Sequence, residues 1–200
     1  MTPSKRIRRT PADLRTEALA AARKLIVEGS GETLTMRAVA DAIGVTYPNL
    51  SHHFGSAAGL HAAVAEELVR ELLETLRATG AEMQRPLENP ERVVEVFFDM
   101  FDRDGLGRLV GWLARADDEG AAVRVHELVE EHIGKIQERY PDQAATLRGL
   151  FPKIALILTL TAYAESSAGR LLGISLGLSA EQRRAAVVEA LAAMKMRIDG

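Results

Sequence analysis

The chain has 200 residues, no cysteine, and 25 basic against 28 acidic side chains, so that its formal net charge is −3. The lack of cysteine excludes a disulfide framework and thiolate metal sites. The longest uncharged stretch in the late apolar region, residues 154–164, has eleven residues and is shorter than the ~20 that a membrane-spanning helix needs. We therefore expect a protein with no membrane span and no signal peptide, located in the cytoplasm.

Charge is divided unevenly along the chain. Residues 1–60 carry eight Lys and Arg side chains and five carboxylates, a net charge of +3, whereas residues 61–200 carry −6. A basic head on an acidic body is typical of a protein that meets nucleic acid phosphates through one domain only. The basic cluster Lys5–Arg9 precedes the first predicted helix, and it is interpreted either as an arm that follows phosphates or as a solvated terminus.

Three helices are predicted early in the chain, with a glycine turn between the second and the third. The first predicted helix covers residues 11–29, because apolar side chains recur there at helical spacing until Gly29. A short second helix follows Thr35, a favourable N-cap, and buries an apolar face that runs from Met36 to Ile43. Gly44 comes next, where a residue without a Cβ can turn the chain through positive φ.

A third predicted helix starts after Thr46, whose hydroxyl is expected to cap it, and ends near Phe54. Leu50 and Phe54 lie four residues apart and can bury one side of it. The remaining surface is polar or aromatic, which a core does not require; it comprises Tyr47, Pro48, Asn49, Ser51, His52 and His53. This order of short helices favours a helix-turn-helix unit.

Residues 46–56 resemble the recognition helix and following turn of TetR-family transcriptional regulators, and the preceding helix at 11–29 fits the same family. The resemblance implies base-edge contacts in the major groove from Tyr47, Pro48 and Asn49, together with Arg37. Arginine can bond guanine and asparagine can bond adenine in this way. The rest of the predicted DNA-binding set, cast mainly as phosphate or sugar contacts, comprises Thr35, Thr46, Ser51, His52 and His53.

Two positions depart from the family pattern. The family usually has a tyrosine where this chain has Ser51, and a lysine where it has Ala57. One familiar phosphate anchor is therefore absent. Backbone N–H groups at the helix start after Ser56 are expected to replace it in part.

The remaining residues are predicted to form a second helical domain at 61–200, after a DNA-binding domain at 1–60, so that the fold class is all-α. Leu60, Val64, Leu68, Leu72 and Leu76 form a series that predicts a helix linking both domains. A break is predicted at residues 84–89 and another at 104–107. Further helices are predicted after Asn89 and at residues 106–116, 121–140 and 154–172, with a last one after a capping box of Ser179 and Gln182.

The helix at residues 154–172 is apolar nearly all round and is expected to meet a partner. The resemblance implies that it and the last helix, whose apolar series ends at Ile198, pair with their copies in a homodimer. The alternative is burial within a monomer. A small apolar or aromatic effector is also expected, with five candidate contacts that could equally be plain core: Phe97, Phe98, Phe101, Trp112 and Tyr163.

The sequence offers little for catalysis. It has no Gly-rich phosphate loop, and His126 with Glu130 is too small a set to predict a metal site. We therefore expect no enzyme and no cofactor, but a homodimeric, effector-responsive repressor that binds a palindromic operator in double-stranded DNA. The alternatives are an activator, a regulator without an effector, or, in another class, a helical enzyme or a protein-interaction module that does not bind DNA.

Overall fold

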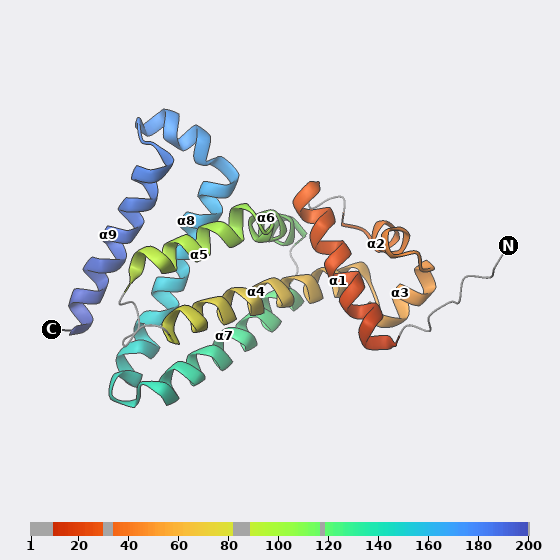
Figure 1. The fold of residues 1–200 in the computed structure, drawn as a ribbon, viewed down its shortest axis with the longest axis horizontal. Helices are drawn as coiled ribbons and strands as arrows, with labels where there is room; N and C mark the ends of the chain where they lie inside the picture. Colours follow the sequence, from red (N-terminus) through yellow and green to blue (C-terminus); the bar gives the residue numbers. More distant parts are fainter. Residues whose placement is uncertain (1–9, 30–33, 82–88, 117–118, 200) are drawn as a thin grey trace.

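The computed structural model describes residues 10–29, 34–81, 89–116 and 119–199. Its elements, in chain order, are α1 (Pro11–Glu28), α2 (Met36–Ile43), α3 (Tyr47–Phe54), α4 (Ala57–Ala81), α5 (Pro90–Asp102), α6 (Leu106–Ala116), α7 (Glu119–Arg139), the short 3-10 helix η2 (Pro141–Gln143), α8 (Ala144–Leu176) and α9 (Ala180–Asp199). Within this described part no strand occurs, so the predicted all-α fold is confirmed. Figure 1 shows α1–α3 as a head at one end and the later helices as a body at the other.

Side-chain caps start most of the helices that the sequence predicted. The Thr35 hydroxyl accepts a backbone N–H three residues on at 3.1 Å, and the Asn89 side chain does the same at 3.0 Å. Ser179 and Gln182 form the predicted capping box, with bonds of 3.1 and 2.8 Å. Thr46 occupies the N-cap position of α3 but makes no capping hydrogen bond, so the prediction that its hydroxyl caps this helix is wrong.

The largest difference from the predicted boundaries lies in α8. This helix starts at Ala144, ten residues before the predicted start at 154, and continues through Pro152 to Leu176. Pro152 cannot bond the carbonyl of Arg148, but both residues are exposed, and water can satisfy that carbonyl. The predicted break at 84–89 lies almost wholly outside the described residues, as does the side chain of Ile198.

Helix α4 belongs to both head and body, as the apolar series predicted. It packs against α1 and α3 near its start and against α5, α6 and α7 along its length. Leu60, Val64 and Leu68 are each no more than 1% exposed, and Leu72 is also buried. The predicted domain boundary at residue 60 therefore falls inside one continuous helix (Figure 1).

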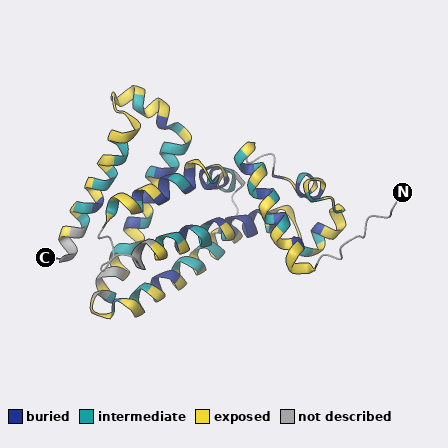
Figure 2. Ribbon diagram, in the orientation of Figure 1, coloured by how far each residue is buried: buried dark blue, intermediate teal, exposed yellow. Residues whose placement is uncertain are grey.

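Burial divides the body into a core and an exposed outer arm. Side chains of α5, α6 and the first half of α8 form the core together with α4, whereas the outer faces of α8 and α9 are largely exposed (Figure 2). None of the helices in the described part of the chain combines the length and apolar composition that a membrane span requires.

His132 on α7 is buried, with its ring centre 5.8 Å from that of Phe151. Burial, followed by the positive charges of Lys135 and Arg77, holds the pKa of His132 below its ordinary value of 6.5. Since the unfolded chain then takes up the proton first, the stability that the neutral ring contributes is complete above pH 6.5 and is lost as the pH falls toward the folded pKa.

We therefore predict that acidification from about pH 7.5 to about pH 5 narrows the stability difference between the wild type and His132→Gln. Urea unfolding of both proteins at each pH measures this difference. Parallel pH profiles for the two proteins would exclude a contribution from His132.

Candidate nucleic-acid interface

A glycine turn fixes the angle between α2 and α3. Gly44 has φ 68° and ψ 38°, the left-handed conformation that favours glycine. Its N–H donates to the end of α2, and the next N–H, that of Val45, donates to the Ala40 carbonyl at 2.9 Å. These bonds satisfy the last carbonyls of α2 and set the direction of α3.

Helix α3 is anchored by its apolar side. Leu50 is fully buried and Phe54 is 8% exposed. The guanidinium of Arg15 on α1 lies 5.3 Å from the centre of the Phe54 ring, a cation–π distance. Because α3 also packs against α2 and α4, its outward face is held in a fixed orientation.

The predicted DNA-binding residues lie at the start of α2 and along α3, two helices that pack against each other. Tyr47 is 50% exposed although it is large and aromatic. Ser51 and His53 are half-buried. The other members are exposed; they are Thr35, Arg37, Thr46, Pro48, Asn49 and His52.

Internal contacts distinguish these side chains. The Ser51 hydroxyl donates to the Gly55 carbonyl at 3.1 Å, so its proton is already used within the turn. The rings of His52 and His53 lie 5.8 Å apart, edge to face. In contrast, no hydrogen bond from the side chains of Arg37, Tyr47 or Asn49 is found among the described residues, which leaves their polar atoms available to a ligand.

Residues 18–64 match the family model described as bacterial regulatory proteins, tetR family. This stretch is therefore similar to the DNA-binding part of TetR-family proteins. The match supports a DNA-binding transcriptional regulator, and the matched range extends from the middle of α1 through α2 and α3 into α4. No curated protein matches the chain significantly.

The sequence did not predict a joint between the head and the body of this chain. Arg108 on α6 donates to the carbonyls of Ile26 and Val27 at the end of α1. The last turn of α1 has no basic residue of its own, so Arg108 supplies the positive charge that a helix C-terminus favours. Gly105, at φ 87°, lies so close that an added Cβ would be 2.8 Å from the Ile26 side chain.

A second contact strengthens the same joint. Arg23 on α1 pairs with Glu71 of α4 at 2.6 Å and with Asp104, just before α6, at 2.8 Å. These contacts join residues 48 to 82 positions apart, and no local pattern could have identified them. The head is therefore attached to the body through the turn before α6 as well as through α4.

The five aromatic residues predicted to contact an effector lie in the body. Phe97, Phe98 and Phe101 are buried on α5, with the rings of Phe97 and Phe101 stacked at 6.5 Å. Tyr163 lies against the backbone of α6, where its hydroxyl is 2.9 Å from the position of a Cβ added to Gly111.

Trp112 occupies a different environment, near the head. Its ring lies 3.8 Å from that of His61, and His61 Nε2 is 2.7 Å from the carbonyl of Leu34, which precedes α2. Trp112 is therefore linked to the head through one buried histidine of α4.

Proposed function

We propose that the protein is a homodimeric repressor that binds a palindromic operator and responds to a small molecule. The observation that carries the DNA-binding part is the exposed start of α3, where Tyr47 and Asn49 project from a helix anchored by Leu50 and Phe54. An exposed polar and aromatic face on a rigid helix is what major-groove readout requires.

Replacing Tyr47 or Asn49 with alanine is expected to weaken operator binding by about 1–3 kcal/mol for each substitution. The thermal unfolding temperature should stay nearly unchanged, because neither side chain is buried. Fluorescence anisotropy with an operator selected from random duplexes, and with a scrambled duplex of equal length, measures both affinities.

His52→Ala is the matched comparison, because His52 is exposed on the same helix but is assigned to the phosphates. It should weaken binding to both duplexes alike. Equal losses on the operator and the scrambled duplex for Tyr47→Ala and Asn49→Ala would contradict base reading by these residues.

The exposed face of α8 and α9 supports the homodimer. Large apolar side chains are exposed along this arm; they include Leu156, Leu160, Leu171, Ile174 and Met196. Monomeric proteins rarely leave so extended an apolar surface in water. On α9, the same exposed side carries small residues that allow close approach of a second helix, namely Ala186, Ala190 and Ala193.

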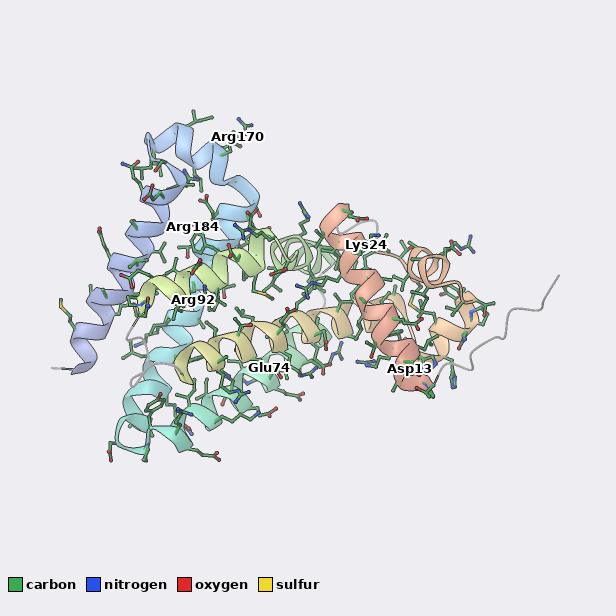
Figure 3. The ribbon with its side chains drawn as sticks, in the orientation of Figure 1. Asp13, Lys24, Glu74, Arg92, Arg170 and Arg184 are labelled. Carbon is green, nitrogen blue, oxygen red and sulfur yellow. The ribbon has the colours of Figure 1, made fainter. Side chains whose placement is uncertain are left out.

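A half-buried ion pair holds the two helices of this arm together. Arg183 on α9 donates to both carboxylate oxygens of Glu165 on α8, at 2.8 and 2.6 Å, and this pairing lowers the pKa of Glu165. Arg184, labelled in Figure 3, lies 5.2 Å from the centre of the Phe98 ring and attaches α9 to α5. A fixed pair of helices is a suitable half of a four-helix interface.

The effector response is proposed to act through the aromatic part of the body and the joint with the head. Phe97, Phe98, Phe101, Trp112 and Tyr163 remain the candidate contacts for an apolar or aromatic effector. The edge-to-face contact of Trp112 with His61 and the attachment of α6 to α1 support this route. A ligand that favours one position of α6 necessarily favours one position of the head.

Arg108→Ala is predicted to loosen the head from the body and to lower the free energy of unfolding by about 1 kcal/mol. Amide hydrogen exchange should accelerate at the end of α1. Arg103→Ala is the control, because Arg103 is a nearby arginine whose side chain is 73% exposed and, among the described residues, forms only a 3.5 Å pair with Asp99. If Arg103→Ala accelerated exchange at the end of α1 as much as Arg108→Ala, Arg108 would have no special part in the joint.

A further inference from the structure

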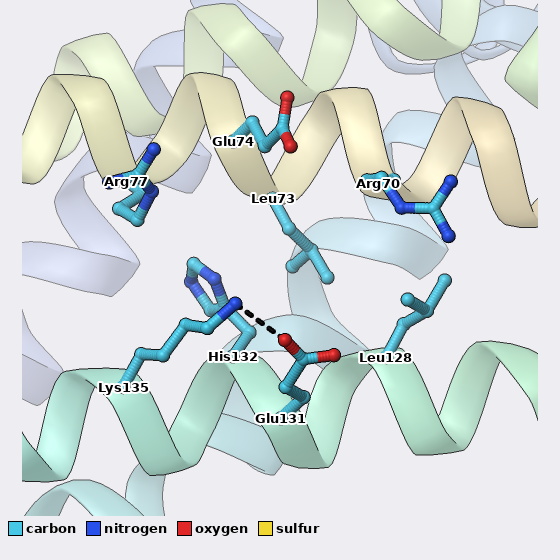
Figure 4. Close-up of a pocket in the computed structure, with 8 residues that line it drawn as sticks. All are labelled: Arg70, Leu73, Glu74, Arg77, Leu128, Glu131, His132 and Lys135. Atoms are coloured by element: carbon cyan, nitrogen blue, oxygen red, sulfur yellow. Dashed lines mark hydrogen bonds and ion pairs between the residues drawn. The ribbon is translucent and has the colours of Figure 1, made fainter.

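A pocket of about 470 Å³ opens between α4 and α7 in the body (Figure 4). It is separate from the five aromatic residues discussed above, and its volume lies in the range of small-molecule sites. Its lining residues are Arg70, Leu73, Glu74, Arg77, Leu128, Glu131, His132 and Lys135.

Two of the positive side chains that line the pocket already have carboxylate partners. Arg70 bonds Glu66 at 2.5 Å and Glu67 at 3.2 Å, both on its own helix. Lys135 donates to Glu131 at 2.5 Å, and the pairing lowers the pKa of Glu131. Glu74 makes no hydrogen bond or ion pair with any of the described residues, and Figure 4 shows its carboxylate pointing away from α7.

The surroundings of Arg77 differ from those of Arg70. Arg77 makes no hydrogen bond or ion pair with any of the described residues, and Figure 4 shows it on α4 across from His132 and Lys135 on α7. The positive charges of Arg77 and Lys135 both act on the His132 ring. A neutral His132 has one N–H to donate, so three donors lie together here beside two partly or fully buried leucines, Leu73 and Leu128.

We propose that this pocket binds a small organic carboxylate with an apolar body. The carboxylate lies between the guanidinium of Arg77 and the ammonium of Lys135, and the apolar part covers Leu73 and Leu128. A planar guanidinium suits a carboxylate in two parallel hydrogen bonds. One carboxylate is accommodated, whereas a second on the same molecule would meet Glu74 or Glu131.

A cation fits this pocket less well, because three of its lining side chains are positive, Arg70, Arg77 and Lys135, whereas two are negative, Glu74 and Glu131. The proposal concerns binding by the free protein. It goes beyond the proposed function, since it holds whether or not the bound acid changes affinity for DNA. A protein that binds no acid could therefore still bind the operator, and the two experiments test the two proposals independently.

Isothermal titration of the full-length protein with phenylacetate and with octanoate tests the proposal, with phenylacetamide and octanamide as neutral counterparts. At least one acid should bind saturably, and its amide should bind at least about tenfold more weakly. NMR titration of the His132 ring adds a site-specific readout. The bound anion should raise the pKa of His132, because it offsets the two cations that lower it.

Arg77→Gln should weaken binding of the acid by about tenfold to a hundredfold without unfolding the protein, because Arg77 is exposed. Arg170→Gln removes an exposed arginine on α8, away from this pocket, and should bind like the wild type (Figure 3). Lack of saturable binding by both acids would overturn the proposal. Equal binding of acid and amide, or wild-type affinity in Arg77→Gln, would also overturn it.

Discussion

A glutamate in place of Leu160 is expected to separate the proposed dimer into folded monomers. Leu160 is 58% exposed on the apolar face of α8, so the monomer can accept a charge there at little cost. In a symmetric interface the substitution places two unpaired carboxylates out of water, and an uncompensated buried charge costs about 3–5 kcal/mol. Dimer affinity should therefore fall by at least about a hundredfold, which sedimentation equilibrium measures directly.

Val123→Glu is the matched control for this substitution. Val123 is 56% exposed, but it lies on α7 and outside the proposed interface. It should remain dimeric. Deletion of α8 would be a poorer test, because Ile154, Leu158 and Ala162 of that helix belong to the core of the body. A Leu160→Glu protein that sediments as the wild type does would place the interface elsewhere.

Loss of the dimer should also remove tight operator binding. A single head contacts one half-site, whereas two linked heads gain the second half-site at a high effective concentration. The operator affinity of the monomeric Leu160→Glu protein should therefore be at least about a hundredfold lower than that of the wild type, whereas Val123→Glu should keep the wild-type affinity.

The second large effect is expected from Gly59→Ala in the head. A Cβ at Gly59 would be 2.0 Å from the carbonyl oxygen of Phe54, the last residue of α3. This neighbour is backbone and cannot rotate away, so α3 must shift against α4. We predict a loss of about 1–3 kcal/mol in the free energy of unfolding. Operator affinity should fall as well, because the position of α3 changes; chemical denaturation and anisotropy measure the two effects.

Gly134→Ala provides the control for the same chemical change. Gly134 lies within α7, and a Cβ there would meet nothing within 4 Å. Alanine is favoured over glycine inside a helix by roughly 0.5–1 kcal/mol, so this variant should be slightly more stable than the wild type. A Gly59→Ala protein with wild-type stability and operator affinity would show that the approach to Phe54 is not a constraint.

Local sequence features explain why much of the head could be predicted. The cap at Thr35, the left-handed glycine at Gly44 and the buried pair Leu50 and Phe54 are each determined by residues within a turn or two of the chain. Thr46 occupies the N-cap position with extended backbone, but its hydroxyl makes no capping hydrogen bond. The residue type predicts where a helix begins, and it does not determine whether the side chain bonds there.

Long-range contacts could not be predicted in the same way. The bonds from Arg108 to the end of α1 and the pair of Arg23 with Asp104 depend on how the helices pack, and neither has a periodic signature. Helix α8 starts ten residues before its predicted start and contains Pro152, a residue type that usually ends or kinks a helix. The pocket lies between α4 and α7, two helices that are far apart in the chain. No local pattern in the sequence indicates that their charged side chains face the same pocket.

Selection from a pool of random DNA duplexes, followed by sequencing of the bound fraction, tests the central claim most directly. We predict an enriched palindrome whose half-sites are separated by about one helical turn of DNA or a multiple of it. The Tyr47→Ala protein should recover a palindrome with relaxed preference at one or two positions of each half-site. A bound fraction without an enriched palindrome would contradict the proposal that two copies of α3 read an operator.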